Sequence, residues 1–316
     1  MLRAQKGIVQ FTVIAILLVS VFCLARENSA SNKEDQTPKT DVIVFSYDRP
    51  LQLNALLQSM AQYISGLGSI EIIVRCSSQE YRDAYDIVAQ TFPHVIFTHQ
   101  GSVPHADFKK LTLQAFNRTK NAYIIFAVDD DIITDTIDLV EAVGLLERTQ
   151  AYGFYFRLAP HLTYCYSMQK KQALPPLSPI GEGVYTWSFN QGELDWAYPN
   201  TLDVALYRKK DVAPFLTNLN YHSPNSLEGT WDAHKGKYFY GKGLCYEHTK
   251  MVNIPLNKVQ NENNNVHMDG YGPEELLTAF YAGSRIDISS LYAITNESAH
   301  MPYVPTLMLP GRSTPN

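Results

Sequence analysis

In the first half of the chain, short apolar runs alternate with stretches in which apolar residues recur at helical spacing. The runs are rich in Val, Ile and Phe and are bounded by polar residues, which indicates buried strands at residues 41–46, 70–74, 94–98 and 122–128. The stretches between them predict helices over residues 51–63, 81–92 and 107–117. Continuous apolar strands are typical of a sheet whose two faces are covered by helices. The pattern therefore predicts a parallel, doubly wound α/β half over residues 41–131.

The second half of the chain has a different composition. Residues 152–246 hold 11 of the 20 tyrosines and all three tryptophans. We expect short strands at residues 154–158 and 202–207, joined by long loops rather than regular helices. A helix is expected to begin in the GPEE stretch at residues 272–275, where a proline in the first turn precedes two acids. The proline-dotted residues 301–316 are expected to form a loose tail.

The N-terminus carries an uncharged run from Gly7 to Ala25, preceded by Arg3 and Lys6. About 20 apolar residues cross a bilayer as a helix, so residues 1–26 are interpreted as a signal anchor or as a cleaved signal peptide. Residues 27–40 are polar and form a linker to a single domain over residues 41–300. Both interpretations predict a domain outside the cytoplasm. It is either the extracytoplasmic or luminal domain of a single-pass membrane protein, or a secreted domain.

Composition narrows the class of protein. Apolar residues make up 45% of the 316 residues, charged residues make up 18%, and the formal net charge is −5. Such a chain can bury a full core, and its mild acidity argues against a dedicated nucleic-acid binder. The four cysteines show no CxxC spacing and therefore predict no zinc cluster. One disulfide is possible, and its pairing stays open.

The sharpest motif is the acidic triplet Asp129-Asp130-Asp131, directly after the predicted strand at residues 122–128. Three adjacent carboxylates repel one another unless a cation or hydrogen-bond donors neutralise them. Two alternating carboxylates can hold a divalent ion and leave room for phosphate oxygens. The alternative is an acidic turn that caps a helix starting near Thr134 or Asp135.

The order of several stretches then suggests a family. The chain carries VIVFSYDRPLQLNALLQSM, EIIVRCSS, AYIIFAVDDDI, LAPHLTYCY, DWAYPNTLDVALYRK, SPNSLEG and GPEELLTAF. Over about residues 41–290 it resembles a GT-A-type nucleotide-diphospho-sugar glycosyltransferase, similar to family 2. The resemblance implies a Rossmann-type, mostly parallel sheet with a mixed second half. Residues 41–131 would then bind the nucleotide sugar, and residues 132–300 would bind the acceptor.

The resemblance also implies roles for residues of the first half. Asp129 and Asp131 match the outer carboxylates of the DxD motif, which holds Mn²⁺ or Mg²⁺ on the donor diphosphate. His248 is a candidate for completing the metal shell. The candidate donor-binding residues follow the predicted strands or lie on the third helix: Ser46, Tyr47, Asp48, Arg49, Lys109 and Asp130. For Asp48 the alternative is an ordinary turn before proline, and for Lys109 it is a solvated lysine.

In the second half, Glu228 matches the position of the acid that many inverting members use to deprotonate the acceptor hydroxyl. Asp195, Asp203 and Asp232 compete with it for that role. The candidate acceptor-binding residues are aromatic: Trp187, Trp196, Tyr198 and Trp231. For any single one of these rings the alternative is a place in the core.

The sequence therefore predicts a metal-assisted transferase with a nucleotide-diphospho-sugar donor and a glycan or other hydroxyl acceptor. The membrane is a further expected partner, through the N-terminal segment, and nucleic acid is not expected. Two other classes remain. One is a non-catalytic carbohydrate-binding protein on the same scaffold. The other is a metal-dependent phosphoesterase, which usually adds histidines near its aspartates.

Overall fold

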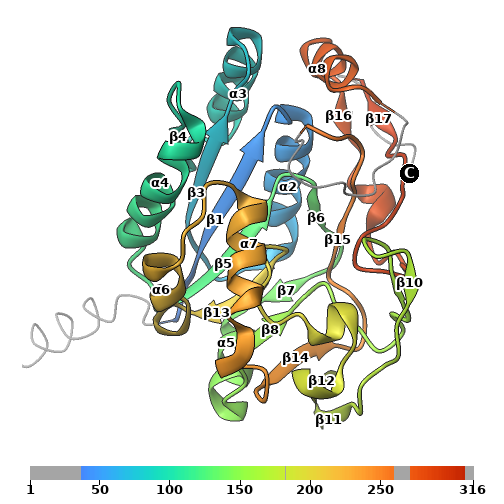
Figure 1. Cartoon of the computed structure of the whole chain (residues 1–316). Helices are drawn as coiled ribbons and strands as arrows, with labels where there is room; N and C mark the ends of the chain where they lie inside the picture. The colour runs from blue at the N-terminus through green and yellow to red at the C-terminus, as the bar shows by residue number, and fades with distance from the viewer. Residues whose placement is uncertain (1–36, 182, 260–270, 310–316) are drawn as a thin grey trace, which may run out of the picture. The chain divides into compact units, whose positions relative to one another are not determined.

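Four parallel strands form one end of the main sheet (Figure 1). The structure is a computed structural model that describes residues 37–181, 183–259 and 271–309. The predicted segment 1–26 lies outside the described residues, as does nearly all of the linker. The four strands confirm the predicted α/β half and run in the order β5–β1–β3–β4. Their bounds are β1 (Thr40–Tyr47), β3 (Leu67–Arg75), β4 (Ile96–His99) and β5 (Tyr123–Val128).

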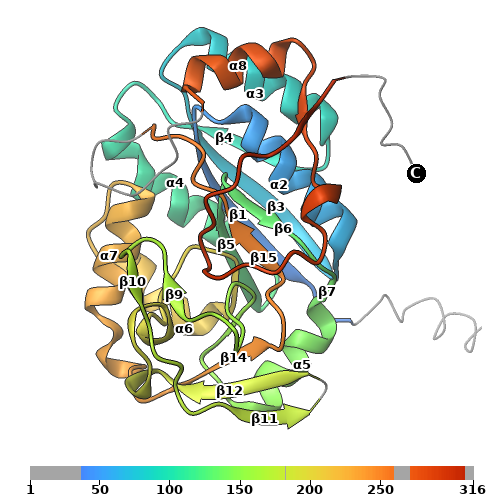
Figure 2. The ribbon, with the colours of Figure 1, turned by 90° about the vertical axis from the view of Figure 1, so that its right-hand side faces the viewer.

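Helices cover both faces of this sheet, as the continuous apolar strands predict (Figure 2). Along β1, Val42 and Val44 pack into one core while Ile43 and Phe45 pack into the other. The first core includes residues of α2 (Pro50–Tyr63), α3 (Gln79–Thr91), α5 (Leu139–Thr149) and α8 (Pro273–Tyr281). The second includes residues of α4 (Pro104–Arg118), α6 (Lys209–Asn218) and α7 (Pro224–Ala233).

The second half of the chain extends the same sheet with mixed strand directions. The strand β13 (Ala205–Arg208) lies antiparallel between β5 and β8 (Gly153–Tyr155). Beyond β8 come β14 (Lys242–Tyr246), β12 (Val184–Ser188) and β11 (Ser178–Gly181). Within the described ranges this gives one nine-stranded sheet, in the order β11–β12–β14–β8–β13–β5–β1–β3–β4.

Short strand pairs tie the connecting segments to the sheet. They are β6 (Asp131–Ile133) with β15 (Met251–Asn253), β2 (Ile64–Ser65) with β7 (Ile137–Asp138), β9 (Tyr164–Cys165) with β10 (Lys170–Lys171), and β16 (Arg285–Ile286) with β17 (Leu307–Met308). Single 3₁₀ turns occur at η1 (Phe189–Gln191), η2 (Leu194–Ala197), η3 (Lys235–Lys237) and η4 (Ser289–Leu291). The pairing of β17 corrects the expected loose tail for residues 301–309; residues 310–316 lie outside the described residues.

Three helices were not predicted from the sequence. The helix α6 contains Pro214, and a proline within a helical pattern normally argues against a helix. In α7, Pro224 occupies the first turn, and the Ser223 and Ser226 side chains cap the start reciprocally. The helix α5 begins after Asp138, whose carboxylate accepts from two backbone N–H groups. The alternative interpretation of the acidic triplet places the start of a helix near Thr134 or Asp135. The helix α5 starts later, at Leu139, because β6 and β7 occupy the residues before it.

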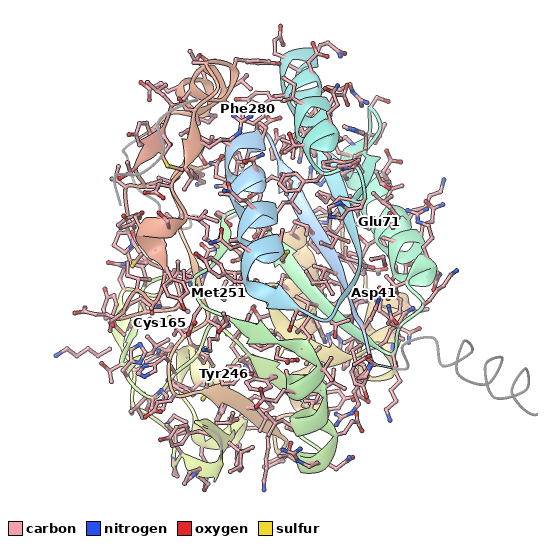
Figure 3. All side chains as sticks on the ribbon, turned by 180° about the vertical axis from the view of Figure 1, so that it is seen from behind. Asp41, Glu71, Cys165, Tyr246, Met251 and Phe280 are labelled. Carbon is pink, nitrogen blue, oxygen red and sulfur yellow. The ribbon has the colours of Figure 1, made fainter. Side chains whose placement is uncertain are left out.

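Buried carboxylates also occur far from any pocket. Asp41 lies at the amino end of β1, the opposite end of the strand from Tyr47 (Figure 3), and accepts four hydrogen bonds from Ser69 and Asn121. Glu71, in the middle of β3, pairs with Arg118. A buried acid is therefore not by itself a sign of a functional site in this fold.

Two further observations concern the described residues. Cys76, Cys165 and Cys245 are free thiols, so the possible disulfide is not formed among them. No helix within residues 37–181, 183–259 and 271–309 is long and apolar enough to span a membrane.

Candidate active site

A pocket of about 710 Å³ opens at the carboxyl edge of the parallel strands. Ligands of open α/β sheets bind at this edge. The strand ends supply one wall: Ser46, Tyr47 and Arg49 after β1, Arg75 at the end of β3, Gln100 after β4, and Asp129 and Asp130 after β5. The opposite wall comes from the second half of the chain and includes Arg157, Asp195, Tyr198, Asp203, Glu228 and His300. The pocket thus joins the two predicted half-sites.

Arg49 is the cation that faces the acidic triplet. Its Nη1 donates to Asp129 Oδ1 at 3.0 Å and to Asp130 Oδ2 at 2.7 Å. Its Nε donates to Asn257 Oδ1, and its Nη2 donates to the Asn257 carbonyl oxygen. The other oxygen of Asp129 accepts from Ser46 Oγ and from the Tyr47 amide, each at 2.9 Å. One guanidinium therefore fastens the loop after β1 to the end of β5.

The acids of the triplet face different surroundings. Burial raises the pKa of Asp129 to about 6, and Arg49 opposes that rise. Asp131 is fully buried and does not line the pocket. Its oxygens accept from the Val128 amide and from Asn253 Nδ2, each at 3.0 Å. Burial, followed by repulsion from Asp203, raises the pKa of Asp131 well above its ordinary value.

The structure separates the residues predicted as metal ligands. The carboxylates that reach the pocket are the adjacent pair Asp129 and Asp130, not the alternating pair Asp129 and Asp131, because the first residue of β6 turns its side chain into the protein. His248 lines a separate pocket of about 530 Å³, where its ring lies 6.3 Å from that of His161. In the part of the chain that the structure describes, no three His, Cys, Asp or Glu side chains form a cluster that could hold a metal by themselves.

Glu228 stands on α7 and faces the pocket from the second half of the chain. Its Oε1 accepts from the Leu202 amide at 2.9 Å. Burial and repulsion from Asp203 raise its pKa from 4.5 to about 7, against smaller opposing effects that include the Arg157 charge. A carboxylate with a pKa near neutrality is suited to accept a proton from a hydroxyl. Of the acids proposed as the base, Glu228 is the one with this combination of position and pKa.

The two competing aspartates in the pocket have partners of their own. Asp195 accepts from Arg157 Nη1 at 3.1 Å, and its other oxygen accepts from Gln172 Nε2 at 3.3 Å. This ion pair is buried, so Asp195 serves as the counter-ion of Arg157. Asp203 lies 3.6 Å from His300 Nε2 and raises the pKa of both Asp131 and Glu228. Asp203 therefore couples the acidic triplet to the candidate base.

Asp232, the third competing acid, is absent from the pocket lining. Its carboxylate forms an ion pair with Lys235, three residues later in the chain, whose Nζ lies 3.2 Å away.

The predicted aromatic acceptor surface is wrong for its three tryptophans. Trp187, Trp196 and Trp231 are at most 2% exposed and belong to the core on the α4–α6–α7 side of the sheet. Trp187 and Trp196 pack edge to face, with ring centres 5.0 Å apart. Rings of this size gain most from full burial, which explains why the core takes them. Tyr198 does line the pocket, where Lys235 lies 6.0 Å from the centre of its ring.

Two predicted donor-binding residues face away from the pocket. Lys109 donates to the Leu219 carbonyl at 2.6 Å, which joins α4 to the end of α6. Asp48 adopts a left-handed backbone conformation, with φ of 51°, and its carboxylate accepts from the Ser77 amide. Both side chains form hydrogen bonds to distant parts of the chain, and neither lines the pocket. Ser46, Tyr47, Arg49 and Asp130 are the predicted donor-binding residues that line the pocket.

Sequence reasoning missed four residues of the pocket: Arg157, Asn253, Asn257 and His300. Arg75 directly follows a predicted strand, and the sheet edge at which that strand ends is where a ligand is expected. The four missed residues come from the second half, where each is set by long-range pairing. Asn253 and His300, for example, form an isolated backbone bridge across 47 positions of sequence that carry no matching pattern.

Comparisons with known proteins agree with the resemblance. No family model matches the chain. The bifunctional glycosyltransferase pgtA of Dictyostelium discoideum is 25% identical over 251 residues, which are 69% of this chain and 32% of that protein. The chain thus spans about a third of the length of this curated relative. The similarity confirms the predicted resemblance to glycosyltransferases.

Solved structures with partial similarity include two complexes with bound ligands. S. aureus TarS 1-349 in complex with UDP-GlcNAc has 16% identity and a TM-score of 0.43, over 82% of this chain and 68% of that one. GalNAc-T7 with UDP, GalNAc and Mn²⁺ has 10% identity and a TM-score of 0.48, over 79% of this chain and 51% of that one.

Proposed function

We propose that this chain is a glycosyltransferase that moves a sugar from a nucleotide-diphosphate donor to an acceptor hydroxyl. The observation that supports this most is the pocket itself. It places Asp129, Asp130 and Arg49 at the end of the parallel strands and Glu228 on the facing helix. The similarity to a glycosyltransferase over 69% of the chain points the same way.

The donor half of the pocket would hold the diphosphate near Arg49 and Asp130. Carboxylate oxygens are the ligands that Mg²⁺ and Mn²⁺ prefer, and a diphosphate brings further oxygens of the same kind. The pair Asp129 and Asp130 therefore fits a divalent cation that the donor completes. When bound, such a cation offsets charge on the leaving nucleotide diphosphate. Arg49 keeps the two carboxylates in place from the protein side.

The acceptor half would supply the base. Glu228 accepts the proton of the acceptor hydroxyl as that oxygen bonds to the sugar and the nucleotide diphosphate departs. Leu202 holds one carboxylate oxygen, and Glu228 lines the pocket in which the hydroxyl would bind. Arg157, locked by Asp195, stabilises the ionised form of Glu228 through its charge. Tyr198 is the aromatic side chain of the predicted set that can contact an acceptor.

The alternatives are less well supported. A carbohydrate-binding protein would use exposed aromatic rings, but the three tryptophans are in the core. A phosphoesterase would use histidines beside the aspartates, and the described residues contain no such cluster. We also propose that residues 1–26 are a membrane anchor or a signal peptide and that the domain after them lies outside the cytoplasm.

A nucleotide-sugar screen tests the proposed function. Thermal unfolding is followed with a panel of UDP- and GDP-sugars, each with Mn²⁺ and with EDTA. A donor that binds the folded state raises the unfolding temperature, and a ligand at 100 times its Kd contributes about 2.7 kcal/mol. The best donor is then incubated with acceptor sugars, and release of free nucleotide diphosphate is measured. No stabilisation by any nucleotide sugar would contradict the proposal.

A further inference from the structure

Arg75 is the pocket arginine that forms no ion pair within the residues that the structure describes, and the Asp48 carboxylate feels its charge. Three arginines line the pocket: Arg49, Arg75 and Arg157. Arg49 pairs with two aspartates and Arg157 with one. The guanidinium of Arg75 instead lies over the ring of Tyr47, 4.2 Å from its centre. Its donors are thus available to a ligand.

The position of Arg75 separates it from the acidic end of the pocket. Arg75 ends β3 and Asp129 follows β5, and these strands lie on either side of β1. Neighbouring strands are about 4.8 Å apart, so the two sites lie about 10 Å apart across the sheet. That separation is comparable to the distance from a nucleobase to its own terminal phosphate. A donor whose diphosphate lies near Arg49 therefore extends its base toward Arg75.

We propose that Arg75 reads the nucleobase of the donor and that the preferred donor is a guanine nucleotide sugar. The inference rests on the proposed function and specifies its substrate. A guanidinium has five N–H donors in a planar fork and no acceptor. Guanine presents two acceptors, O6 and N7, on one edge, which the fork meets with two parallel bonds. In uracil the N3–H donor lies between the two carbonyl oxygens. The guanidinium has no acceptor for this N–H, so it cannot form two parallel bonds to that edge.

Gln100 supplies the complementary group at the same end of the pocket. Its backbone amide donates to the Val74 carbonyl at 2.8 Å, so it is held beside the end of β3. Its Nε2 donates to the Pro104 carbonyl at 2.7 Å. The amide oxygen Oε1 is then the atom left to accept from the N1–H or N2–H₂ groups of guanine. Tyr47 and Arg75 also pair in register at the end of the two strands, which places the Tyr47 ring beside the guanidinium.

Titration calorimetry with GDP, UDP and inorganic pyrophosphate tests the proposal on the full chain in the presence of Mn²⁺. A bidentate contact of this kind discriminates bases by about 1–3 kcal/mol, so we expect GDP to bind about 5- to 150-fold more tightly than UDP. Arg75→Lys keeps the charge but loses the fork. In this variant GDP affinity should fall to near that of UDP, while UDP and pyrophosphate should change less than about threefold.

Arg82→Lys is the matched control, because Arg82 lies on α3 outside the pocket and should leave both affinities unchanged. Arg75→Gln, with its unfolding temperature measured, separates loss of the contact from loss of folding. Tighter binding of UDP than of GDP by the unaltered protein would overturn the proposal. So would an equal loss of GDP, UDP and pyrophosphate in Arg75→Gln, which would make Arg75 a phosphate ligand. If no nucleotide binds the unaltered protein, the proposed function itself fails.

Discussion

The substitution Glu228→Gln tests the catalytic assignment in two independent ways. Glutamine keeps the shape of the side chain and can still accept from the Leu202 amide, but it cannot take a proton near neutral pH. Loss of a general base lowers turnover by about 10²–10⁴-fold. We expect transfer to fall by that factor while nucleotide affinity changes less than about threefold. In the unaltered enzyme, transfer should decline about tenfold per pH unit below the Glu228 pKa of about 7.

The same pKa predicts an effect on stability. The pKa of Glu228 is 4.5 by reference and about 7 in the folded protein, so the folded state binds the proton more tightly. Stability contributed by this group is present below pH 4.5 and is lost as the pH rises toward 7. One pKa unit corresponds to 1.36 kcal/mol, so the ionised Glu228 costs at most about 3 kcal/mol above pH 7. Glu228→Gln removes this cost and should stabilise the protein at pH 8 but not at pH 4.

The assays are urea unfolding at pH 4 and pH 8, calorimetric titration of the donor nucleotide, and transfer measured between pH 5 and pH 9. Glu80→Gln is the control, because Glu80 is exposed at the start of α3 and remote from the pocket. Near-normal transfer in Glu228→Gln would refute the assignment and leave Asp203 as the next candidate. A variant that is less stable at both pH values would show that Glu228 has a structural role instead.

Three further changes test other parts of the structure. Asp130→Asn should remove most of the Mn²⁺ dependence of nucleotide binding in calorimetry. Asp131→Asn should retain this dependence, because Asp131 is buried. The reverse result would support Asp129 and Asp131 as the metal ligands. Trp196→Ala should lower the free energy of unfolding in urea by about 3–5 kcal/mol, as for other buried aromatic residues. A variant with unchanged stability but weaker acceptor binding would contradict the place of Trp196 in the core. A chain of residues 36–316 should be soluble and should unfold in one transition, since β1 begins at Thr40; an insoluble product would contradict that boundary.

The predictable part of the fold is the part with local signals. All four parallel strands and the helices between them follow from apolar runs and helical spacing, because both signals lie within a single element. The residues at or next to the ends of these strands, among them Ser46, Arg75 and Asp129, line one pocket. The second half of the chain lacks such local signals. The strand β13 pairs with residues some 80 positions earlier, and short strands between long segments give weak periodicity.

The site shows the same division. Asp129 could be found because it directly follows a predicted strand, and Arg49 because it lies in the turn after another. Which acid of the triplet faces the pocket depends on β6 turning toward β15, a pairing across about 120 positions. The tryptophans were misplaced because an aromatic side chain has the same sequence signal in a core as on a sugar-binding surface.

The place of β13 in the sheet also affects how the protein is made. The first half, ending at Asp131, contains all four parallel strands, but β5 has only β1 beside it until β13 has been synthesised. An apolar strand with one open edge is a template for pairing with other chains. A nascent chain therefore exposes this edge over the addition of about 80 residues, which corresponds to about 4–16 s at ordinary rates of synthesis. Fragments that end between β5 and β13 should aggregate, and chaperones that bind extended apolar segments should act on this protein during that interval.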